Sequence, residues 1–253
     1  MELLLIGIGT GNPEHLTLQA IRELNRADLV LIPRKGARKE DLAGLRRAIC
    51  EQVLENPATL VEFDMPVRDE ATLDYITRVN DWHDAIAGCW MQALGSNPGA
   101  KVAALLVWGD PALYDSTLRI AARLGDAVTV RVIPGVMSLQ ALTAAHAIPL
   151  NELGAPFLVT TGRRLRDHGW PEGVETLVVM LDGECSFQSL APEGVRIWWG
   201  AYVGMAEQIT DSGPLAEAGP RIIATRETAR AAHGWIMDIY LLRRTTAQSE
   251  SAP

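Results

Sequence analysis

The residues best suited to chemistry form one short segment, Gly109-Asp110-Pro111-Ala112-Leu113-Tyr114. It follows the apolar run 102–108, which predicts a strand that ends in this loop. An aspartate framed by glycine and proline at a strand end can orient a polar ligand, and it can equally well cap a turn. Leu113 and Tyr114 would add an aliphatic and an aromatic wall, although such a pair more often only packs. On its own, the segment indicates a turn that is suited to a ligand.

A second segment of interest is Gly7-Ile8-Gly9-Thr10-Gly11, which follows the apolar run 3–6. Glycines in this position invite comparison with dinucleotide-binding loops. A GxGxxG pattern begun at Gly7 requires glycine at position 12, where Asn12 stands, and the next apolar run ends in Pro33-Arg34 without an acid for a ribose. The spacing disfavours a dehydrogenase. The glycines instead predict a tight turn that lets a ligand or a neighbouring loop approach the backbone.

The elements that must position these segments alternate over the first 150 residues. Short apolar runs predict strands over 3–6, 29–32, 59–63, 102–108 and 128–133. Apolar residues at intervals of three and four predict helices over 16–27, 42–53, 73–94, 118–124 and 137–147. This order predicts an α/β domain with a largely parallel sheet, whose ligand loops lie at the carboxyl ends of the strands.

A second domain is predicted after the segment 149–156, where Pro149, Gly154 and Pro156 indicate a linker. We therefore expect domains over 1–150 and 151–245, followed by a flexible polar tail over 246–253. In the second domain the pattern predicts few helices and strands over 157–161, 176–181, 196–201, 221–225 and 235–243.

Composition limits the class of protein. The chain has 253 residues, of which 48% are hydrophobic and 21% charged, as expected of a globular protein of two domains. Its net charge of −8 disfavours broad binding to nucleic acid or to an anionic membrane. Its apolar runs are far shorter than the roughly 20 residues of a membrane span. The three cysteines form no CxxC pair, so we expect a reducing cytoplasm and no metal site.

Four ordered segments of the chain resemble the motifs of the tetrapyrrole (corrin/porphyrin) methylases. They are GIGTGNPEHLT within 6–30, the loop Gly109 to Tyr114, Pro134-Gly135-Val136-Met137-Ser138, and Ala147-Ile148-Pro149-Leu150. A looser similarity continues through 157–162, 176–183 and 200–208. Four motifs in order over about 145 residues are far more specific than one glycine pattern.

The resemblance implies two α/β domains of the tetrapyrrole methylase type, with a mostly parallel N-terminal sheet, a mixed C-terminal sheet and an active-site cleft between them. It also implies S-adenosylmethionine as methyl donor, S-adenosylhomocysteine as product, a tetrapyrrole substrate and a homodimer. The segments 37–95 and 230–240 most resemble the deacetylating members of cobalamin biosynthesis. Such an enzyme methylates C-1 of precorrin-5 and releases acetate to give precorrin-6A.

The resemblance also assigns site residues. Asp110 and Tyr114 are the predicted catalytic residues. The predicted cofactor contacts are Thr10, Gly109, Asp110, Leu113, Met137, Ser138, Met180, Leu181, Ala201, Tyr202, Arg221 and Ile222. Because arginine forks bind carboxylates in a bidentate manner, the predicted contacts to the polycarboxylate substrate are Arg34, Arg38, Arg163 and Arg164.

Other functions remain open at this point. Another tetrapyrrole methylase would act at a different ring carbon, and more distant relatives would act on a protein side chain or on ribosomal RNA, which the acidic charge disfavours. A non-catalytic module would bind a tetrapyrrole or nucleotide without methyl transfer. For acetate release, Asp110, His146 and His233 are conceivable assistants, but the sequence does not single one out.

Overall fold

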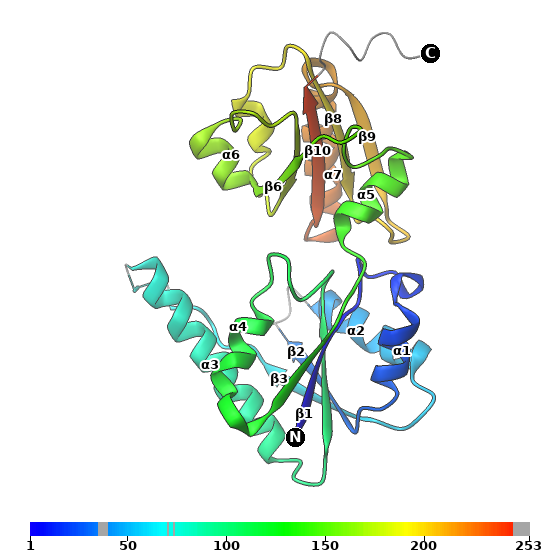
Figure 1. Cartoon of the computed structure of the whole chain (residues 1–253), viewed down its shortest axis with the longest axis vertical. Coiled ribbons are helices and arrows are strands. Elements are labelled where there is room, and N and C mark those ends of the chain that lie inside the picture. The colour runs from blue at the N-terminus through cyan, green and yellow to red at the C-terminus, as the bar shows by residue number, and fades with distance from the viewer. Residues whose placement is uncertain (35–39, 70, 73, 245–253) are drawn as a thin grey trace. The chain divides into compact units, whose positions relative to one another are not determined.

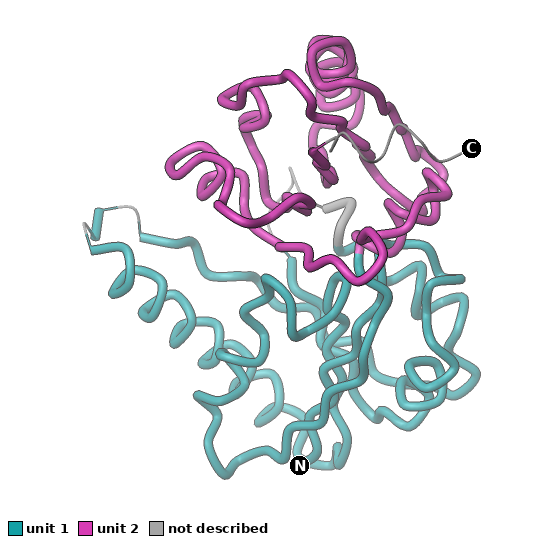
Figure 2. Tube along the Cα trace, turned by 45° about the horizontal axis from the view of Figure 1, so that its top comes forward, with its two compact units in different colours: residues 1–137 teal, residues 138–253 magenta. Residues whose placement is uncertain are grey.

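The computed structural model describes residues 1–34, 40–69, 71–72 and 74–244. Two compact units make up the chain, Met1–Met137 and Ser138–Pro253, which Figure 2 colours separately. Each unit contains one five-stranded sheet. The predicted fold class, α/β with a parallel and a mixed sheet, is confirmed. Arg38 and the predicted tail 246–253 lie outside the described residues, and the domain boundary at residue 150 stays a prediction.

The sheet of the first unit is entirely parallel, in the order β3-β2-β4-β1-β5. Its strands are β1 (Glu2–Gly7), β2 (Leu29–Arg34), β3 (Thr59–Asp64), β4 (Val102–Val107) and β5 (Thr129–Ile133). The central strands are buried on both faces: Leu3 and Leu5 of β1 pack into one hydrophobic cluster, and Leu4 and Ile6 pack into another. Burial on both faces explains their continuously apolar sequences.

Helices cover both faces of this sheet (Figure 1). One face carries α1 (Leu18–Leu24) and α2 (Glu40–Val53), and the other carries α3 (Tyr75–Gly95) and α4 (Thr117–Ala121). The steps from β1 to β2 to β3 run in one direction across the sheet, and the steps from β3 to β4 to β5 run back. Right-handed crossovers therefore place the two pairs of helices on opposite faces.

The neighbours β2 and β4 form the topological switch point of this sheet, because the chain leaves β2 for β3 on one side and leaves β4 for β5 on the other. Their pairing is also short. Only 29–31 of β2 pair with 103–105 of β4, after which β2 continues beside β3 and β4 continues beside β1. The two strands thus separate at their carboxyl ends. In sheets of this kind such a crevice is the usual place for a ligand.

The sheet of the second unit is mixed, in the order β6-β7-β10-β8-β9, with a parallel pair β6–β7 and antiparallel pairing elsewhere. Its strands are β6 (Phe157–Thr161), β7 (Thr176–Met180), β8 (Val195–Ala201), β9 (Ile209–Pro214) and β10 (Asp238–Arg244). Its helices are α5 (Ser138–His146), α6 (Gly162–His168) and α7 (Leu215–His233). Short 3-10 helices occur in both units. The first unit has η1 (Pro13–His15) and η3 (Ala122–Ala127), and the second has η4 (Ser186–Ser189).

The predicted strand over 221–225 is wrong, because these residues lie within the long helix α7. The β-branched stretch Arg221-Ile-Ile-Ala-Thr225 suggested a strand. However, the buried residues Leu215, Ala218, Ile222, Arg226 and Ala229 recur at intervals of three and four, which is the pattern of a helix. The prediction also missed β9, whose sequence Ile-Thr-Asp-Ser-Gly-Pro is too polar to suggest a strand.

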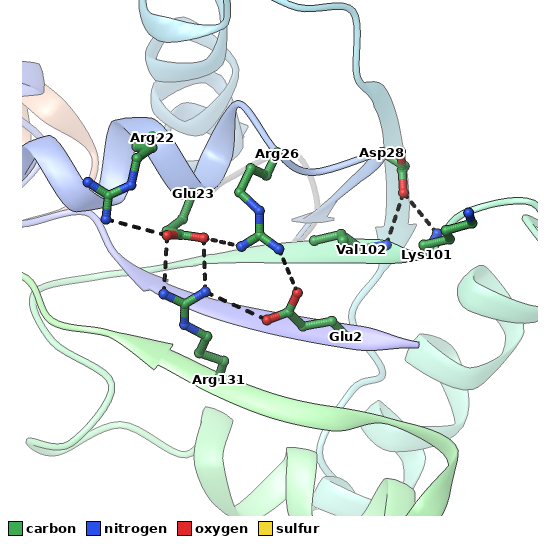
Figure 3. A network of polar contacts seen from close by, with 8 residues as sticks. All are labelled: Glu2, Arg22, Glu23, Arg26, Asp28, Lys101, Val102 and Arg131. Carbon is green, nitrogen blue, oxygen red and sulfur yellow. Dashed lines mark hydrogen bonds and ion pairs between the residues drawn. The ribbon is translucent and has the colours of Figure 1, made fainter.

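Glu23 of α1 joins this helix to the sheet of the first unit through arginines (Figure 3). Its carboxylate is almost fully buried; it accepts two hydrogen bonds of 3.1 Å from Arg131 of β5 and one from Arg26. Arg26 also contacts Glu2 of β1 at 3.0 Å. Burial alone would raise the pKa of Glu23, but the bond from Arg26 and the charge of Arg131 outweigh it and hold this pKa below its ordinary value.

We expect the Glu23→Gln variant to lose about 2 kcal/mol of unfolding free energy at pH 7, because charge-assisted hydrogen bonds become neutral ones. A lowered folded-state pKa stabilises the protein above the unfolded pKa, and this contribution disappears as pH falls through the folded value. Urea unfolding at pH 7 and below pH 4 measures this, with the exposed Glu14→Gln as control. A deficit in Glu23→Gln that stayed constant down to low pH would contradict an ionic role.

Candidate active site

Three loops meet at the carboxyl edge of the first sheet. Strand β1 ends at Gly7, and Gly109 and Gly135 each lie two residues beyond the ends of β4 and β5. Their backbones touch directly. A Cβ at Gly135 would lie 2.1 Å from the carbonyl oxygen of Gly109, and a Cβ at Gly7 would lie 2.6 Å from the nitrogen of Gly135. Both distances are too short for any side chain, so glycine is required here by contact between loops. Gly9 and Gly109 also pair, with Gly109 N–H donating to the Gly9 carbonyl at 2.7 Å.

Asp110 ties two of these loops together through its carboxylate. One oxygen, Oδ1, accepts from the N–H of Ala112 at 2.8 Å and forms the turn of its own loop. The other, Oδ2, accepts from the N–H of Gly135 in the loop after β5 at 2.9 Å. The sequence suggested two roles for this residue, orienting a ligand and capping a turn. The hydrogen bonds show that Asp110 caps the turn of its own loop and links this loop to the loop after β5.

The other predicted catalytic and cofactor residues of the first unit lie in or next to these loops. Tyr114 is 43% exposed and has a backbone φ of 49°, while Leu113 and Met137 are half-buried. Thr10 is buried, and its Oγ1 lies 2.9 Å from Nδ1 of His15. The structure therefore brings Gly109 and Asp110 together with the glycines of the neighbouring loops.

In the second unit, Leu181 projects from an anchored turn after β7. The neighbouring Asp182 is buried and accepts hydrogen bonds from the hydroxyl of Tyr240 at 2.6 Å and from that of Ser186 at 2.9 Å. Burial, together with the charge of Asp182, raises the pKa of Tyr240 well above its ordinary value, so this tyrosine keeps its proton and donates a hydrogen bond to the carboxylate. Leu181 itself is 67% exposed and has a φ of 54°.

Tyr202, predicted to contact the cofactor, also has a positive φ, of 51°. Its side chain is buried, and its hydroxyl donates to the carbonyl of Trp235 at 2.6 Å. Its N–H donates to the carbonyl of Met237 at 2.9 Å. Ala201 is buried within β8, half-buried Met180 ends β7, and half-buried Ser138 begins α5.

Backbone strain marks the predicted site segments. Among the described residues, five that are not glycine have a positive φ, namely Tyr114, Ala147, Leu181, Cys185 and Tyr202. Three of them, Tyr114, Leu181 and Tyr202, belong to the predicted site. Such conformations cost about 1–3 kcal/mol each and accumulate at ligand sites. The observed strain supports a binding role for these segments.

The described members of the predicted substrate arginines belong to both units. Arg34 forms ion pairs with Asp64 at 2.9 Å and with Glu62 at 3.6 Å on β3. Arg163 and Arg164 are exposed in the first turn of α6 in the second unit. Two predicted cofactor contacts lie on α7: Arg221 pairs with Asp211 at 2.7 Å, and Ile222 is fully buried. All of these assignments stay predictions.

We expect the Leu181→Gly variant to weaken the affinity for S-adenosylhomocysteine about tenfold without lowering stability. The variant removes an exposed apolar contact, while glycine relieves a strained φ whose cost is about 1–2 kcal/mol. Isothermal titration calorimetry and urea unfolding measure the two quantities. The control is Leu153→Gly, at a fully exposed leucine of the same unit. Equal affinities in Leu181→Gly and the wild type would exclude Leu181 from the cofactor site.

In the described part of the chain, no group of three or more histidine, cysteine, aspartate or glutamate side chains is placed to hold a metal ion. Within the same residues, no helix has the length and hydropathy of a membrane span.

Comparison with known proteins gives this geometry a context. Residues 2–219 match the family model of the tetrapyrrole (corrin/porphyrin) methylases. The chain is 51% identical over 249 residues to the deacetylating precorrin-6A synthase of Sinorhizobium sp., an alignment that covers 96% of this chain and 95% of that protein. It is 32% identical to the precorrin-2 C(20)-methyltransferase of the same source, over 58% of this chain and 59% of that one.

Solved structures show the same fold. A cobalamin synthesis related protein (CobF) of Corynebacterium diphtheriae is 36% identical, with a TM-score of 0.83 and coverage of 97% of this chain and 99% of that one. A uroporphyrin-III C-methyltransferase of Thermus thermophilus, solved with S-adenosylhomocysteine, has a TM-score of 0.58 at 21% identity, covering 96% of this chain and 97% of that one, and shows the likeness of fold alone.

Proposed function

The chain belongs to the tetrapyrrole (corrin/porphyrin) methylase family, and from this premise we propose that it is a deacetylating precorrin-6A synthase of cobalamin biosynthesis. It is an S-adenosylmethionine-dependent methyltransferase. Its reaction places a methyl group on C-1 of precorrin-5 and releases the acetyl group as acetate, which gives precorrin-6A. The observation that carries this proposal is the high identity, over nearly the full length of both chains, to an enzyme of that name.

The described residues fit a sulfonium cofactor that is held largely by backbone groups. When bound, S-adenosylmethionine supplies an electrophilic methyl group. Methyl transfer is an in-line displacement, so the main task of the protein is to fix distances and angles. The loop Gly109 to Tyr114 is held by Asp110 and by the contacts between glycines, and Leu181 and Tyr202 have strained backbones of the kind that accumulates at ligand sites. We assign these segments to cofactor binding.

Binding and turnover together test this function. Calorimetry with S-adenosylhomocysteine measures cofactor affinity, and methyl transfer to precorrin-5 and to corrin precursors of other methylation stages measures specificity. We expect micromolar binding and turnover of precorrin-5 alone. Binding without methyl transfer to any corrin precursor would indicate a non-catalytic module, and turnover of a different precursor would indicate a methylase of another ring carbon.

A homodimer located in the cytoplasm is part of the same proposal, and it rests on the resemblance to the family. Light scattering coupled to size-exclusion chromatography measures the mass of the particle in solution. A monomer at micromolar concentration would contradict the dimer.

A further inference from the structure

A pocket lies at the topological switch point of the first unit, where β2 and β4 separate. It is lined by residues of β2, β3, β4, α2, α3 and α4 and of the loop after β4. Among the lining residues are Arg46, Trp82, Trp90, Trp108, Tyr114 and Asp115. Tyr114, at the end of the Gly-Asp-Pro loop, thus connects the pocket to the candidate active site of this unit. Neither Arg46 nor the tryptophans were among the predicted site residues, because only the fold brings them together.

Arg46 brings a positive charge to this pocket. It is 8% exposed, and its Nε donates to the carbonyl of Leu106 at 3.0 Å, just beyond the last residue of β4 that pairs with β2. Its guanidinium lies over the ring of Trp108, 5.3 Å from the centroid. Burial lowers the pKa of Arg46 to about 10, and the charge of Asp115 opposes that effect. The guanidinium therefore remains charged at neutral pH.

Two indole N–H groups in the lining have no acceptor among the described residues. They are Nε1 of Trp90 and Nε1 of Trp108, and both are buried. Trp82 in the same lining differs, because its Nε1 donates to the carbonyl of Pro66 at 2.7 Å. A buried donor without an acceptor costs about 1–3 kcal/mol, and such groups are rare unless a water or a ligand satisfies them. The residues that line the pocket thus include two indoles whose buried N–H groups have no acceptor, and one cation.

We propose that this pocket binds a carboxylate group, which accepts hydrogen bonds from the indoles of Trp90 and Trp108 and faces the charge of Arg46. A carboxylate supplies several lone pairs and the complementary charge. Asp115 adds a negative charge to the lining, but its Oδ1 is engaged by the N–H of Thr117 at 2.6 Å. The proposed function names two sources for this carboxylate, and the inference rests on it in that respect. One is a carboxylate side chain of the corrin precursor, and the other is the acetate that the reaction releases.

Acetate itself is a probe that requires no turnover. With ¹⁵N-labelled tryptophan, each of the seven indole N–H groups gives one NMR signal, and Trp90→Phe and Trp108→Phe assign the two of interest. We expect sodium acetate to shift these two signals saturably, while those of Trp82 and Trp170, whose N–H groups are already bonded, move little. Acetamide and sodium chloride should have no such effect. A linear response, or equal shifts with acetamide or chloride, would overturn the proposal in favour of a water-filled pocket.

Kinetics with precorrin-5 then distinguishes the two sources. If the substrate side chain occupies the pocket, Trp90→Phe and Trp108→Phe should raise KM about tenfold with kcat little changed, the cost of one charge-assisted hydrogen bond each. If released acetate occupies it, inhibition by added acetate should weaken about tenfold in both variants at unchanged KM. Either result supports a carboxylate site. If Trp90→Phe and Trp108→Phe kept the wild-type KM for precorrin-5 and the wild-type inhibition by acetate, the carboxylate site would be overturned, even if the enzyme is a precorrin-6A synthase. Trp170→Phe is the control variant.

Discussion

The Asp110→Ala variant is expected to lose about 100-fold or more in kcat/KM for methyl transfer while it still folds. The carboxylate holds the N–H groups of Ala112 and Gly135 and so fixes the loop after β4 against the loop after β5. Alanine frees both loops, and a displacement of about 1 Å at the reacting groups can cost about two orders of magnitude in rate. Two lost charge-assisted bonds also cost stability, by about 2–4 kcal/mol. Steady-state kinetics and urea unfolding give the two values.

Asp110→Asn is the matched variant for this prediction. Its single amide oxygen can keep one of the two hydrogen bonds, while its NH₂ group cannot accept the other. We expect activity between those of the wild type and the alanine variant, with a smaller loss of stability. If Asp110→Ala retained wild-type turnover, the hydrogen bonds by which Asp110 links the two loops would have no part in catalysis. If Asp110→Asn were as inactive as alanine but fully stable, the negative charge itself would be required.

The Gly135→Ala variant is expected to lower the unfolding free energy by about 3 kcal/mol or more, because its Cβ would lie 2.1 Å from the Gly109 carbonyl oxygen. No flexible side chain can move aside there, so one of the loops must shift, and we expect methyl transfer to fall with stability. Urea unfolding measures the loss. The control is Gly88→Ala, in the middle of α3 with nothing within 4 Å, which should stabilise slightly. A Gly135→Ala protein with wild-type stability and activity would show that the loop contact is not required.

Much of the first unit could be predicted from the sequence, because strands buried on both faces and helices with one apolar face leave distinct patterns. The apolar runs at Leu3 and Val102 correspond to β1 and β4 within a residue or two at their ends. In α7 the local preference of Arg221-Ile-Ile was misleading, because β-branched residues also occur in helices that a core holds in place. Strand β9 has too few apolar residues for its sequence to predict a strand.

The candidate site was less accessible to sequence reasoning. The motif order located the loop of Asp110, but nothing in the sequence indicated that its carboxylate would hold Gly135 in another loop. The pocket around Arg46 depends on the separation of β2 from β4 and on side chains from α2 and α3, which lie far apart along the chain. Positions that acquire a role only through tertiary contact leave no local signal.

We expect this family member to couple methyl transfer to deacetylation. Incubation of the enzyme with precorrin-5 and S-adenosylmethionine, with mass spectrometry of the corrin product and quantification of acetate, tests it most directly. We expect a product that has gained one methyl group and lost the acetyl group, with one acetate released for each S-adenosylhomocysteine formed. A methylated product that retains the acetyl group, or no methylation of precorrin-5 by an enzyme that methylates another corrin precursor, would contradict it.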